Sequence, residues 1–288
     1  MFGIFSRIGS FILSLFVFIG SIIGIPTSPR GEELDLSGYE LIFKDDFNGN
    51  SIDSENWSAH MDSDTTKTRH GGYWNSSLAE VKDGALHIYT QYLENGVNEG
   101  DPAGWYSAAF DTRGKFEQKC GYFEVRAICP KGKGQWAAYW LLGDDMTNVD
   151  GSGEDGAEID ILESAFYWKG LFKNAVSHCI HYDGYGEGHK STVARQYAVS
   201  GDPYSEYNTY GLMWTEEEYI FYINGVESYR TSYGKTSKVE QYMLLSVEVG
   251  GSDGNPELSW AGPAFDSQHD QDHVSDFIVD YVKVYELA

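Results

Sequence analysis

The sequence predicts an all-β protein built as a sandwich of sheets. Stretches of alternating apolar and polar residues recur from residue 39 onward, and strong helical periodicity is absent after the apolar N-terminal run. The composition agrees, because 15% aromatic residues, 33 glycines and 7 prolines suit many short strands joined by turns. A chain of 288 residues is long enough for one domain of this class.

Turn signals divide the chain into strand-like stretches. Asp83-Gly84 and Asn224-Gly225 are typical of tight hairpin turns, and each separates two stretches of β-forming residues. The acidic, glycine-rich stretch 143–155 is expected to be a loop at the rim of any cleft. Further strands are expected in YELIFKDDF (39–47), KFEQKCGYFEVRAIC (115–129), QWAAYWLLG (135–143), QYMLLSVEVGG (241–251) and DFIVDYVKVYELA (276–288).

The N-terminal 26 residues form a separate segment. An almost wholly apolar run from Ile8 to Ile25 follows the single cation Arg7 and ends at Pro26. Such a run is typical of a secretion signal, although its length also suffices to span a bilayer. We therefore expect a secreted protein with a cleaved signal peptide (1–26). An uncleaved membrane anchor is the alternative, and residues 27–38 are expected to be a linker.

The formal net charge of -24 limits the classes of partner. Binding to phosphate groups depends on clustered Lys and Arg, so nucleic acid and other polyanions are not expected as partners. A neutral polymer fits an acidic protein better.

The cysteines predict neither a disulfide framework nor a metal site. Cys120, Cys129 and Cys179 are odd in number, so at least one thiol stays free if any pair forms. His178 and His181 lie close to Cys179 in the sequence, but a second ligand cluster is missing, so a zinc site is not favoured.

The most informative stretch is GEDGAEIDILESA (153–165), which holds Glu158, Asp160 and Glu163. Side chains alternate between the faces of a regular strand, so Glu163 would point away from the face of the other two acids. One extra residue in a β-bulge would return Glu163 to that face, and bulges are common beside active sites. The motif therefore predicts a bulge near Ile161 or Leu162.

Two glutamates on one face suit glycoside hydrolysis. Carboxyl groups held about 5 to 5.5 Å apart act by double displacement, one as nucleophile and the other as general acid and then base. Asp160, between Glu158 and Glu163, can tune both. The alternative is an acidic strand exposed to solvent. The apolar residues between the acids, and the destabilisation caused by clustered like charges, favour the catalytic interpretation.

Four motifs in order closely resemble glycoside hydrolase family 16, the laminarinase and lichenase group, over about Tyr39 to Glu286. The run EIDILE (158–163) is similar to that family's bulged active-site strand, which has one extra residue between the Asp and the second Glu. The other motifs are GYFEVRAICPKGKGQWAAYWLL (121–142), YGLMWTEEEYIFYINGV (210–226) and VDYVKVYE (279–286).

The resemblance implies a jelly-roll sandwich of two curved antiparallel sheets, with residues 39–288 as the catalytic domain and a concave cleft for a polysaccharide. Glu158 would be the nucleophile, Glu163 the acid/base and Asp160 the residue that supports them. No cofactor is expected for catalysis. The expected protein is a monomeric, endo-acting, retaining hydrolase of β-1,3- or mixed-linkage β-1,3-1,4-glucan. The alternatives are xyloglucan or a galactan as substrate, or a non-catalytic carbohydrate-binding sandwich.

Five residues are candidates for substrate binding. Asn75, Arg113 and His181 match sugar-contacting or active-site positions of the family. Their alternative roles are a backbone cap, an ion pair with an acid and a core histidine, respectively. Trp136 and Trp140 share a face of the strand before the acidic motif, where exposed indoles would stack on pyranose rings. Alternatively, one of the two belongs to the core.

The resemblance also implies a structural calcium site on the convex side. Asp280 would supply a carboxylate, and Asp46 and Gly84 would supply backbone carbonyls, with no metal at all as the alternative. Two features depart from the family's pattern. Residues 154–157 lack the aromatic side chain that often precedes the motif, which leaves specificity open, and Glu248 is an extra acid to which the sequence assigns no role.

Overall fold

The computed structural model describes residues 28–132, 134–165, 174–192, 195–199, 201–250, 261 and 274–288. The expected signal or anchor lies outside these residues. Across the part of the chain that is described, no helix is long and apolar enough to cross a membrane.

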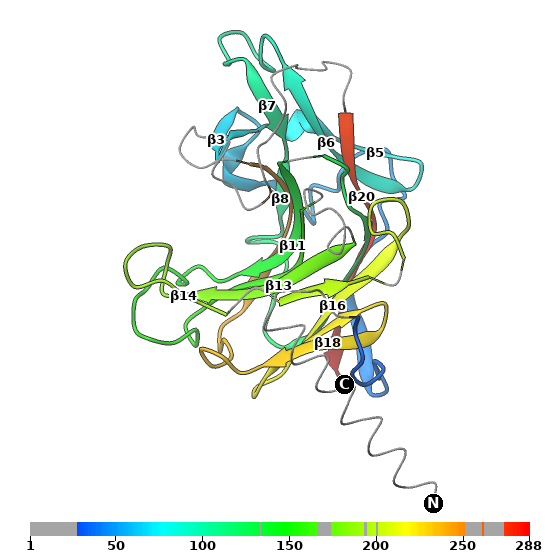
Figure 1. Ribbon diagram of the computed structural model, residues 1–288, viewed down its shortest axis with the longest axis vertical. Helices are drawn as coiled ribbons and strands as arrows, with labels where there is room; N and C mark the ends of the chain where they lie inside the picture. The colour runs from blue at the N-terminus through cyan, green and yellow to red at the C-terminus, as the bar shows by residue number, and fades with distance from the viewer. Residues whose placement is uncertain are drawn as a thin grey trace, which may run out of the picture.

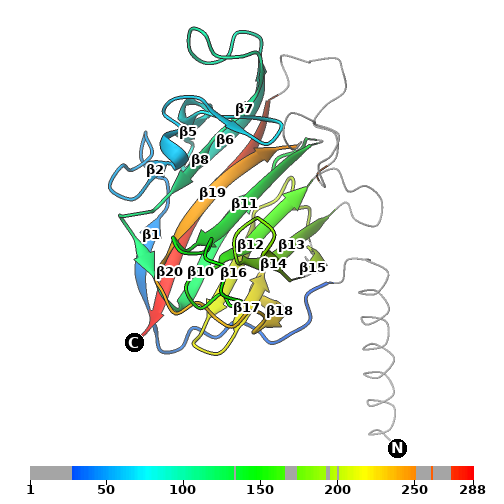
Figure 2. The same cartoon turned by 90° about the vertical axis from the view of Figure 1, so that its left-hand side faces the viewer.

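Two sheets pack face to face, as two views at right angles show (Figures 1 and 2). The larger sheet has eleven strands. Its order is β18 (Val226–Thr231), β17 (Tyr219–Ile223), β16 (Asn208–Trp214), β10 (Gly121–Ile128), β20 (Val274–Leu287), β6 (Ala85–Leu93), β7 (Gly104–Ser107), β4 (Gly72–Trp74) and β3 (Lys67–Arg69), with β1 (Tyr39–Asp45) beside β20 and β5 (Ala79–Lys82) beside β6.

The smaller sheet has nine strands and carries the acidic motif on β12 (Glu158–Ala165). Figure 2 shows β12 between β11 and β13. The full order is β14 (Lys190–Ser191), β13 (Ala175–Tyr182), β12, β11 (Gln135–Leu142), β19 (Gln241–Val249), β8 (Ala109–Asp111) and β2 (Ser58–Ala59), with β15 (Arg195–Ala198) beside β13 and β9 (Glu117–Gln118) beside β19. The helical elements among the described residues are two short 3-10 helices, η1 (His60–Asp62) and η2 (Ser76–Leu78).

The main hydrophobic core lies between the two sheets. The larger sheet contributes fully buried residues such as Phe123 and Val125, and the smaller sheet contributes Ile159, Leu245 and others. Burial of each such side chain stabilises the fold by about 1.5–3 kcal/mol. The predicted all-β sandwich is therefore confirmed.

Both predicted hairpin turns are confirmed. Asp83-Gly84 joins β5 to β6 with φ of 53° and 76°, and Asn224-Gly225 joins β17 to β18 with φ of 50° and 75°. Positive φ at both central residues twists the turn in the sense that paired strands require, and Asn, Asp and Gly tolerate it best.

The stretch 115–129 differs from the single strand expected there, because it divides into β9 and β10. Cys120 and Gly121 both have positive φ, 62° and 113°, at the break. Strand β9 pairs with β19 of the smaller sheet, whereas β10 pairs with β20 of the larger. A side chain at Gly121 would collide with the carbonyl oxygen of Tyr285. The break lets the chain cross from one sheet to the other.

Candidate active site

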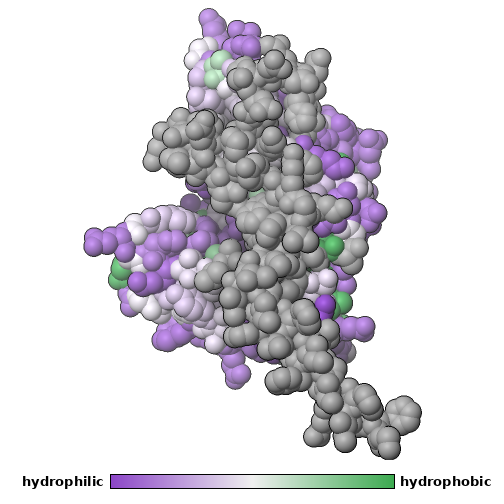
Figure 3. Space-filling model, in the orientation of Figure 1, coloured by the Kyte–Doolittle hydropathy of each residue, from purple (hydrophilic) through white to green (hydrophobic). Residues whose placement is uncertain are grey.

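Strand β12 presents its three acids on the face of the smaller sheet that is turned away from the main core. Ile159, on the opposite face, is fully buried in that core. Asp160 is 4% exposed, and the side chain of Glu158 is 14% exposed. Figure 3 shows the surface indented beside the part of the molecule that carries β14.

The predicted bulge is confirmed at Ile161. Against β11, Asp160 pairs with Trp140 while Leu162 pairs with the adjacent Tyr139. The register against β13 shifts between Asp160 and Glu163 as well. Ile161 is thus the extra residue, and its side chain and that of Leu162 both enter the core. Glu163 therefore returns to the face of the other acids.

His178 holds the bulge from the core side. Its Nδ1 lies 2.7 Å from the carbonyl oxygen of Ile161, and the side chain is completely buried. Burial lowers the pKa of His178 to about 4, so the ring is neutral and Nδ1–H donates to that oxygen. Strand alternation thus turns His178 towards the core, while Cys179 and His181 face the acids.

The two glutamates hold their protons to unusually high pH. Burial and the Asp160 charge raise the pKa of Glu158 to about 7, although His181, Tyr185 and Arg69 act in the lowering direction. Burial and Asp160 also raise the pKa of Glu163, well above its usual range. The charged form is therefore favoured more at Glu158 than at Glu163.

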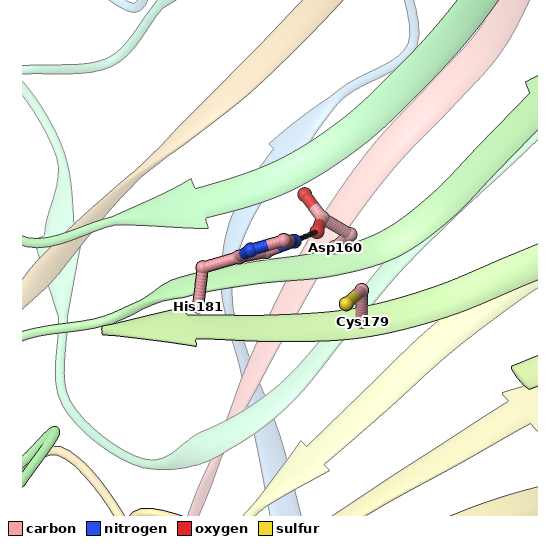
Figure 4. Close-up of side chains that lie close together, drawn as sticks. All are labelled: Asp160, Cys179 and His181. Carbon is pink, nitrogen blue, oxygen red and sulfur yellow. Dashed lines mark ion pairs between the residues drawn. The ribbon is translucent and has the colours of Figure 1, made fainter. Parts of the chain in front are cut away.

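His181 supplies a positive charge to the acidic face. Its Nε2 lies 3.4 Å from Asp160 Oδ2 and 3.9 Å from Glu158 Oε1, and Figure 4 shows the ring directed at Asp160. Burial alone would lower its pKa, but the bond with Asp160 and the charges of Asp160 and Glu158 raise the pKa of His181 to about 12. His181 is therefore an imidazolium among the acids rather than an apolar core residue.

The donor atoms of Asp160, Cys179 and His181 lie within 4.8 Å of one another (Figure 4). Nitrogen, sulfur and carboxylate donors of this kind suit a zinc-like cation better than calcium. All three groups already have protein partners, because Asp160 and His181 pair with each other and the Cys179 thiol lies 3.4 Å from the Thr192 carbonyl oxygen.

Tyr185 is a residue of the site that the sequence analysis missed. Its hydroxyl donates a hydrogen bond to Glu158 Oε2. It lies in the loop between β13 and β14, 27 positions after Glu158. The sequence feature that could have identified it is YDGYGEG (182–188). A tyrosine that stands among several glycines is typical of a loop with an exposed aromatic ring.

Trp136 and Trp140 lie on the cleft face of β11, but neither is the exposed platform expected for stacking. They are 8% and 6% exposed. The ring of His70 lies 5.4 Å from that of Trp136, and His60 approaches Trp140 at 6.3 Å. His70 and His60 thus lie against the indoles, and Ala261 packs on Trp136. Alternation along one strand does not predict which segments will lie over it.

Asn75 and Arg113 make the protein contacts that the alternative interpretations expected, a backbone cap for Asn75 and an ion pair with an acid for Arg113. Asn75 is 2% exposed, and its oxygen accepts from the backbone N–H of Ser77, which caps η2. Arg113 lies half exposed and pairs with Asp144 at 2.8 Å. Sugar contact by either residue stays a prediction.

Glu248 acquires a structural role. It pairs with Trp136 across β19 and β11, so it shares the face of the acids, and it is 3% exposed. Arg69 Nε lies 3.0 Å and 3.1 Å from its two oxygens, and Nη2 lies 3.0 Å from Oε1. This charge-assisted, multiply bonded pair ties β3 of the larger sheet across the cleft to β19 of the smaller.

The three expected calcium ligands lie near one another in the register. Strand β20 pairs with β6 up to Val279 and with β1 from Val282, so Asp280 lies where β6 begins after Gly84 and β1 ends before Asp46. One carboxylate and two carbonyls suit a hard cation. However, Asp280 Oδ2 bonds to Arg126 Nη1 at 2.5 Å, so a cation would compete with Arg126. Calcium binding stays a prediction.

This chain is similar to a known protein family and to several characterised proteins. A family model described as beta-porphyranase A-D, GH16 domain, matches residues 42–287. Glucan endo-1,3-beta-glucosidase A1 of Niallia circulans is 27% identical over 91% of this chain and 39% of its own length. Keratan-sulfate endo-1,4-beta-galactosidase of Sphingobacterium multivorum is 28% identical over 86% of this chain and 56% of its own length.

Solved structures share the architecture. The laminarinase catalytic domain from Thermotoga maritima has a TM-score of 0.66 at 25% identity, covering 86% of this chain and 98% of that one. An endo-1,3-beta-glucanase (laminarinase) from Thermotoga petrophila has a TM-score of 0.67 at 26% identity, with the same coverage of 86% and 98%. The predicted jelly-roll sandwich is confirmed by this likeness.

Proposed function

Because the chain belongs to glycoside hydrolase family 16, we propose that it is an endo-acting, retaining β-glycanase that cleaves β-1,3- or mixed-linkage β-1,3-1,4-glucan. One observation carries the proposal. The bulge at Ile161 brings Glu158, Asp160 and Glu163 onto one face of β12. Double displacement requires two carboxyl groups, about 5 to 5.5 Å apart, that flank the glycosidic bond.

The two glutamates have different roles in the proposed reaction, one as nucleophile and the other as general acid and base. Glu158, kept partly ionised by His181 and Tyr185, attacks the anomeric carbon and forms a glycosyl ester. Glu163 holds its proton more strongly and gives it to the departing glycosidic oxygen. It then takes a proton from the water that hydrolyses the ester, so the anomeric configuration is retained.

Asp160 and His181 control the charge during this cycle. The Asp160 carboxylate lies between the glutamates and raises the pKa of both. The His181 imidazolium, 3.4 Å from Asp160, offsets part of that negative charge. The pair thus keeps one glutamate protonated while the other is ionised.

The names of the relatives support two substrate classes. The Niallia relative and the two Thermotoga structures are named for β-1,3-glucan or laminarin. The family model is named for beta-porphyranases and the Sphingobacterium relative is named a keratan-sulfate endo-1,4-beta-galactosidase, which makes a β-galactan the second candidate. The net charge of -24 favours a neutral polymer over a sulfated one.

The proposed reaction is tested by reducing-sugar release from laminarin, barley β-glucan, lichenan, xyloglucan, agarose and porphyran. We expect release from at least one β-glucan, with Glu158→Gln at least about a thousandfold slower because the nucleophile is lost. The NMR signal of the first-formed anomer should be β. Release from none of these polymers would favour a carbohydrate-binding protein, and equal release by Glu158→Gln would exclude Glu158 as nucleophile.

We also propose that the enzyme acts outside the cell. The support is the apolar run at residues 8–25, which is typical of an export signal. N-terminal sequencing of the protein recovered from an expressing culture tests whether this run is removed.

A further inference from the structure

The loop between β13 and β14 reaches over the acidic face with Tyr185, a side chain that neither transfers a proton nor forms a covalent bond in the reaction described above. Tyr185 is 61% exposed, so its ring is not part of a core. Its hydroxyl nevertheless points inward and donates to Glu158 Oε2. An exposed aromatic ring whose hydroxyl bonds to a largely buried carboxylate is unusual, since exposed tyrosines normally hydrogen-bond to water.

The loop is built to hold Tyr185 in this place. The buried Asp183 accepts hydrogen bonds at 3.1 Å from the backbone N–H groups of Asp150 and Gly151. Gly184, with φ of 70°, donates its N–H to the Met146 carbonyl at 2.9 Å. The acidic loop at 143–155 thus supports the turn from which Tyr185 projects.

The same loop fixes the histidine next to Glu158. His189 stacks on His181 with ring centres 5.1 Å apart, and its Nε2 lies 2.9 Å from His181 Nδ1. Burial and the His181 charge lower the pKa of His189, so the neutral ring accepts from the His181 imidazolium. Tyr185 and His189 therefore act on Glu158 and His181 from one segment, with their own rings 6.3 Å apart.

We propose that Tyr185 is a positioning residue for Glu158: its hydroxyl holds Oε2 in place and leaves Oε1, on the His181 side, to attack the anomeric carbon. This inference rests on the proposed function. The hydrogen bond persists through the reaction, because Oε2 becomes the carbonyl oxygen of the glycosyl ester and remains an acceptor. The loop segment 183–189 is then part of the catalytic apparatus and not only a wall of the cleft.

The electrostatics agree with this role. The ring of Tyr185 is exposed, but its hydroxyl is desolvated over the acidic face, and this desolvation together with the Glu158 charge raises the pKa of Tyr185 well above its usual value, so the hydroxyl keeps its proton and stays a donor. Its bond to Glu158 lowers the pKa of that carboxyl against the effect of burial. Loss of the bond must therefore raise the pKa of Glu158. The other charged groups around Glu158 are Asp160, which raises its pKa, and His181 and Arg69, which lower it. Glu163 lies on the same face, and the Glu158 charge raises the pKa of Glu163.

Tyr185→Phe removes the hydroxyl and keeps the ring. We expect the acid limb of the kcat/KM profile on the best polymer to move up by about one pH unit, because hydrogen bonds to charged groups are worth about that much. Below the limb, kcat/KM should fall about tenfold. Tyr233→Phe is the matched control, because Tyr233 is also an exposed tyrosine (43%) and its ring packs on Tyr182 at 5.7 Å.

Two results would overturn the proposal. The first is a Tyr185→Phe enzyme with the pH profile and kcat of the wild type. The second is a rise in KM alone, which would make Tyr185 a surface for the sugar and not a positioning residue. Thermal unfolding of both variants shows whether an effect comes from loss of structure.

A direct titration separates this inference from the proposed function. The carboxyl carbon of Glu158 can be followed by NMR in protein with 13C-labelled glutamate, and its signal is the one missing from Glu158→Gln. We expect its midpoint to be higher in Tyr185→Phe than in wild type. An unchanged midpoint would overturn the inference even in an active enzyme. A raised midpoint in a protein without activity would support the hydrogen bond from Tyr185 to Glu158 and would place the failure in the proposed function.

Discussion

Glu158 and Glu163 differ from surface glutamates because the fold buries them beside a third acid. Burial disfavours the charged form of each, and Asp160 adds like-charge repulsion. Such an arrangement costs stability, since clustered charges on one sheet face repel. The acidic site therefore lowers the stability of the fold, and in return it gives the glutamates the raised pKa values that proton transfer requires.

The loss of stability caused by the buried acids can be tested through the pH dependence of the free energy of unfolding. A carboxyl whose pKa is raised in the folded protein contributes stability that is fully present below its unfolded pKa, near 4.5, and is lost as pH rises through about 7 for Glu158. Glu158→Gln should therefore increase the free energy of unfolding relative to wild type by about 1–3 kcal/mol at pH 8 and by much less at pH 4.5. Urea unfolding at both pH values measures this difference.

The control is Glu99→Gln, an exposed glutamate outside the site. It should change the free energy of unfolding little at either pH. A gain for Glu158→Gln that is the same at pH 4.5 and pH 8 would contradict the pKa shift as its cause.

At the scale of elements, β12 works because one extra residue changes which way the following side chains point. Ile161 and Leu162 both enter the core, and Glu163 returns to the cleft face. His178, from the neighbouring strand, donates a hydrogen bond of 2.7 Å from its Nδ1 to the carbonyl oxygen of Ile161. A bulge leaves backbone groups without strand partners, so a buried donor of this kind is needed.

His178→Leu should therefore weaken both the fold and the reaction. The buried Ile161 carbonyl would lose its donor at a cost of about 1–3 kcal/mol, and Glu163 would be less well placed. We expect a lower Tm and a lower kcat with KM little changed, measured by circular dichroism and steady-state kinetics. His178→Gln keeps an N–H donor and should lie between the two. A leucine variant as stable and as active as wild type would show that His178 does not hold the bulge.

At the scale of the whole molecule, the cleft is closed by segments from both sheets. The Arg69–Glu248 pair ties β3 of the larger sheet to β19 of the smaller. On the other side, the loop before β14 places Tyr185 on Glu158. The acids on β12 lie between these two contacts, so the packing of the sheets shapes the sugar-binding space.

Calcium, if it binds at Asp280, should stabilise the sandwich without taking part in the chemistry. Asp280 lies where β20, β6 and β1 meet, so a cation there would join three strands. A ligand that binds only the folded state raises Tm. We expect millimolar Ca²⁺ to raise Tm by a few degrees over EDTA in wild type but not in Asp280→Asn. Equal Tm values in Ca²⁺ and EDTA would exclude the site.

Local patterns in the sequence determined the principal strands, both hairpin turns and the bulge, but not the division of the stretch 115–129 into β9 and β10. Alternation and turn chemistry depend on residues close together in the chain, so EIDILE alone required an extra residue between Asp160 and Glu163 if the acids were to meet. The resemblance of four motifs to glycoside hydrolase family 16 supplied the roles of the acids.

Only the tertiary structure decided what lies over the acidic face. Arg69 and Glu248 are 179 positions apart, and Tyr185 reaches Glu158 from another loop. The same folding buried Trp136 and Trp140, which alternation had placed on the cleft face but could not show to be covered. Such contacts depend on how two sheets and their loops close together in space, and no periodicity along the chain records that.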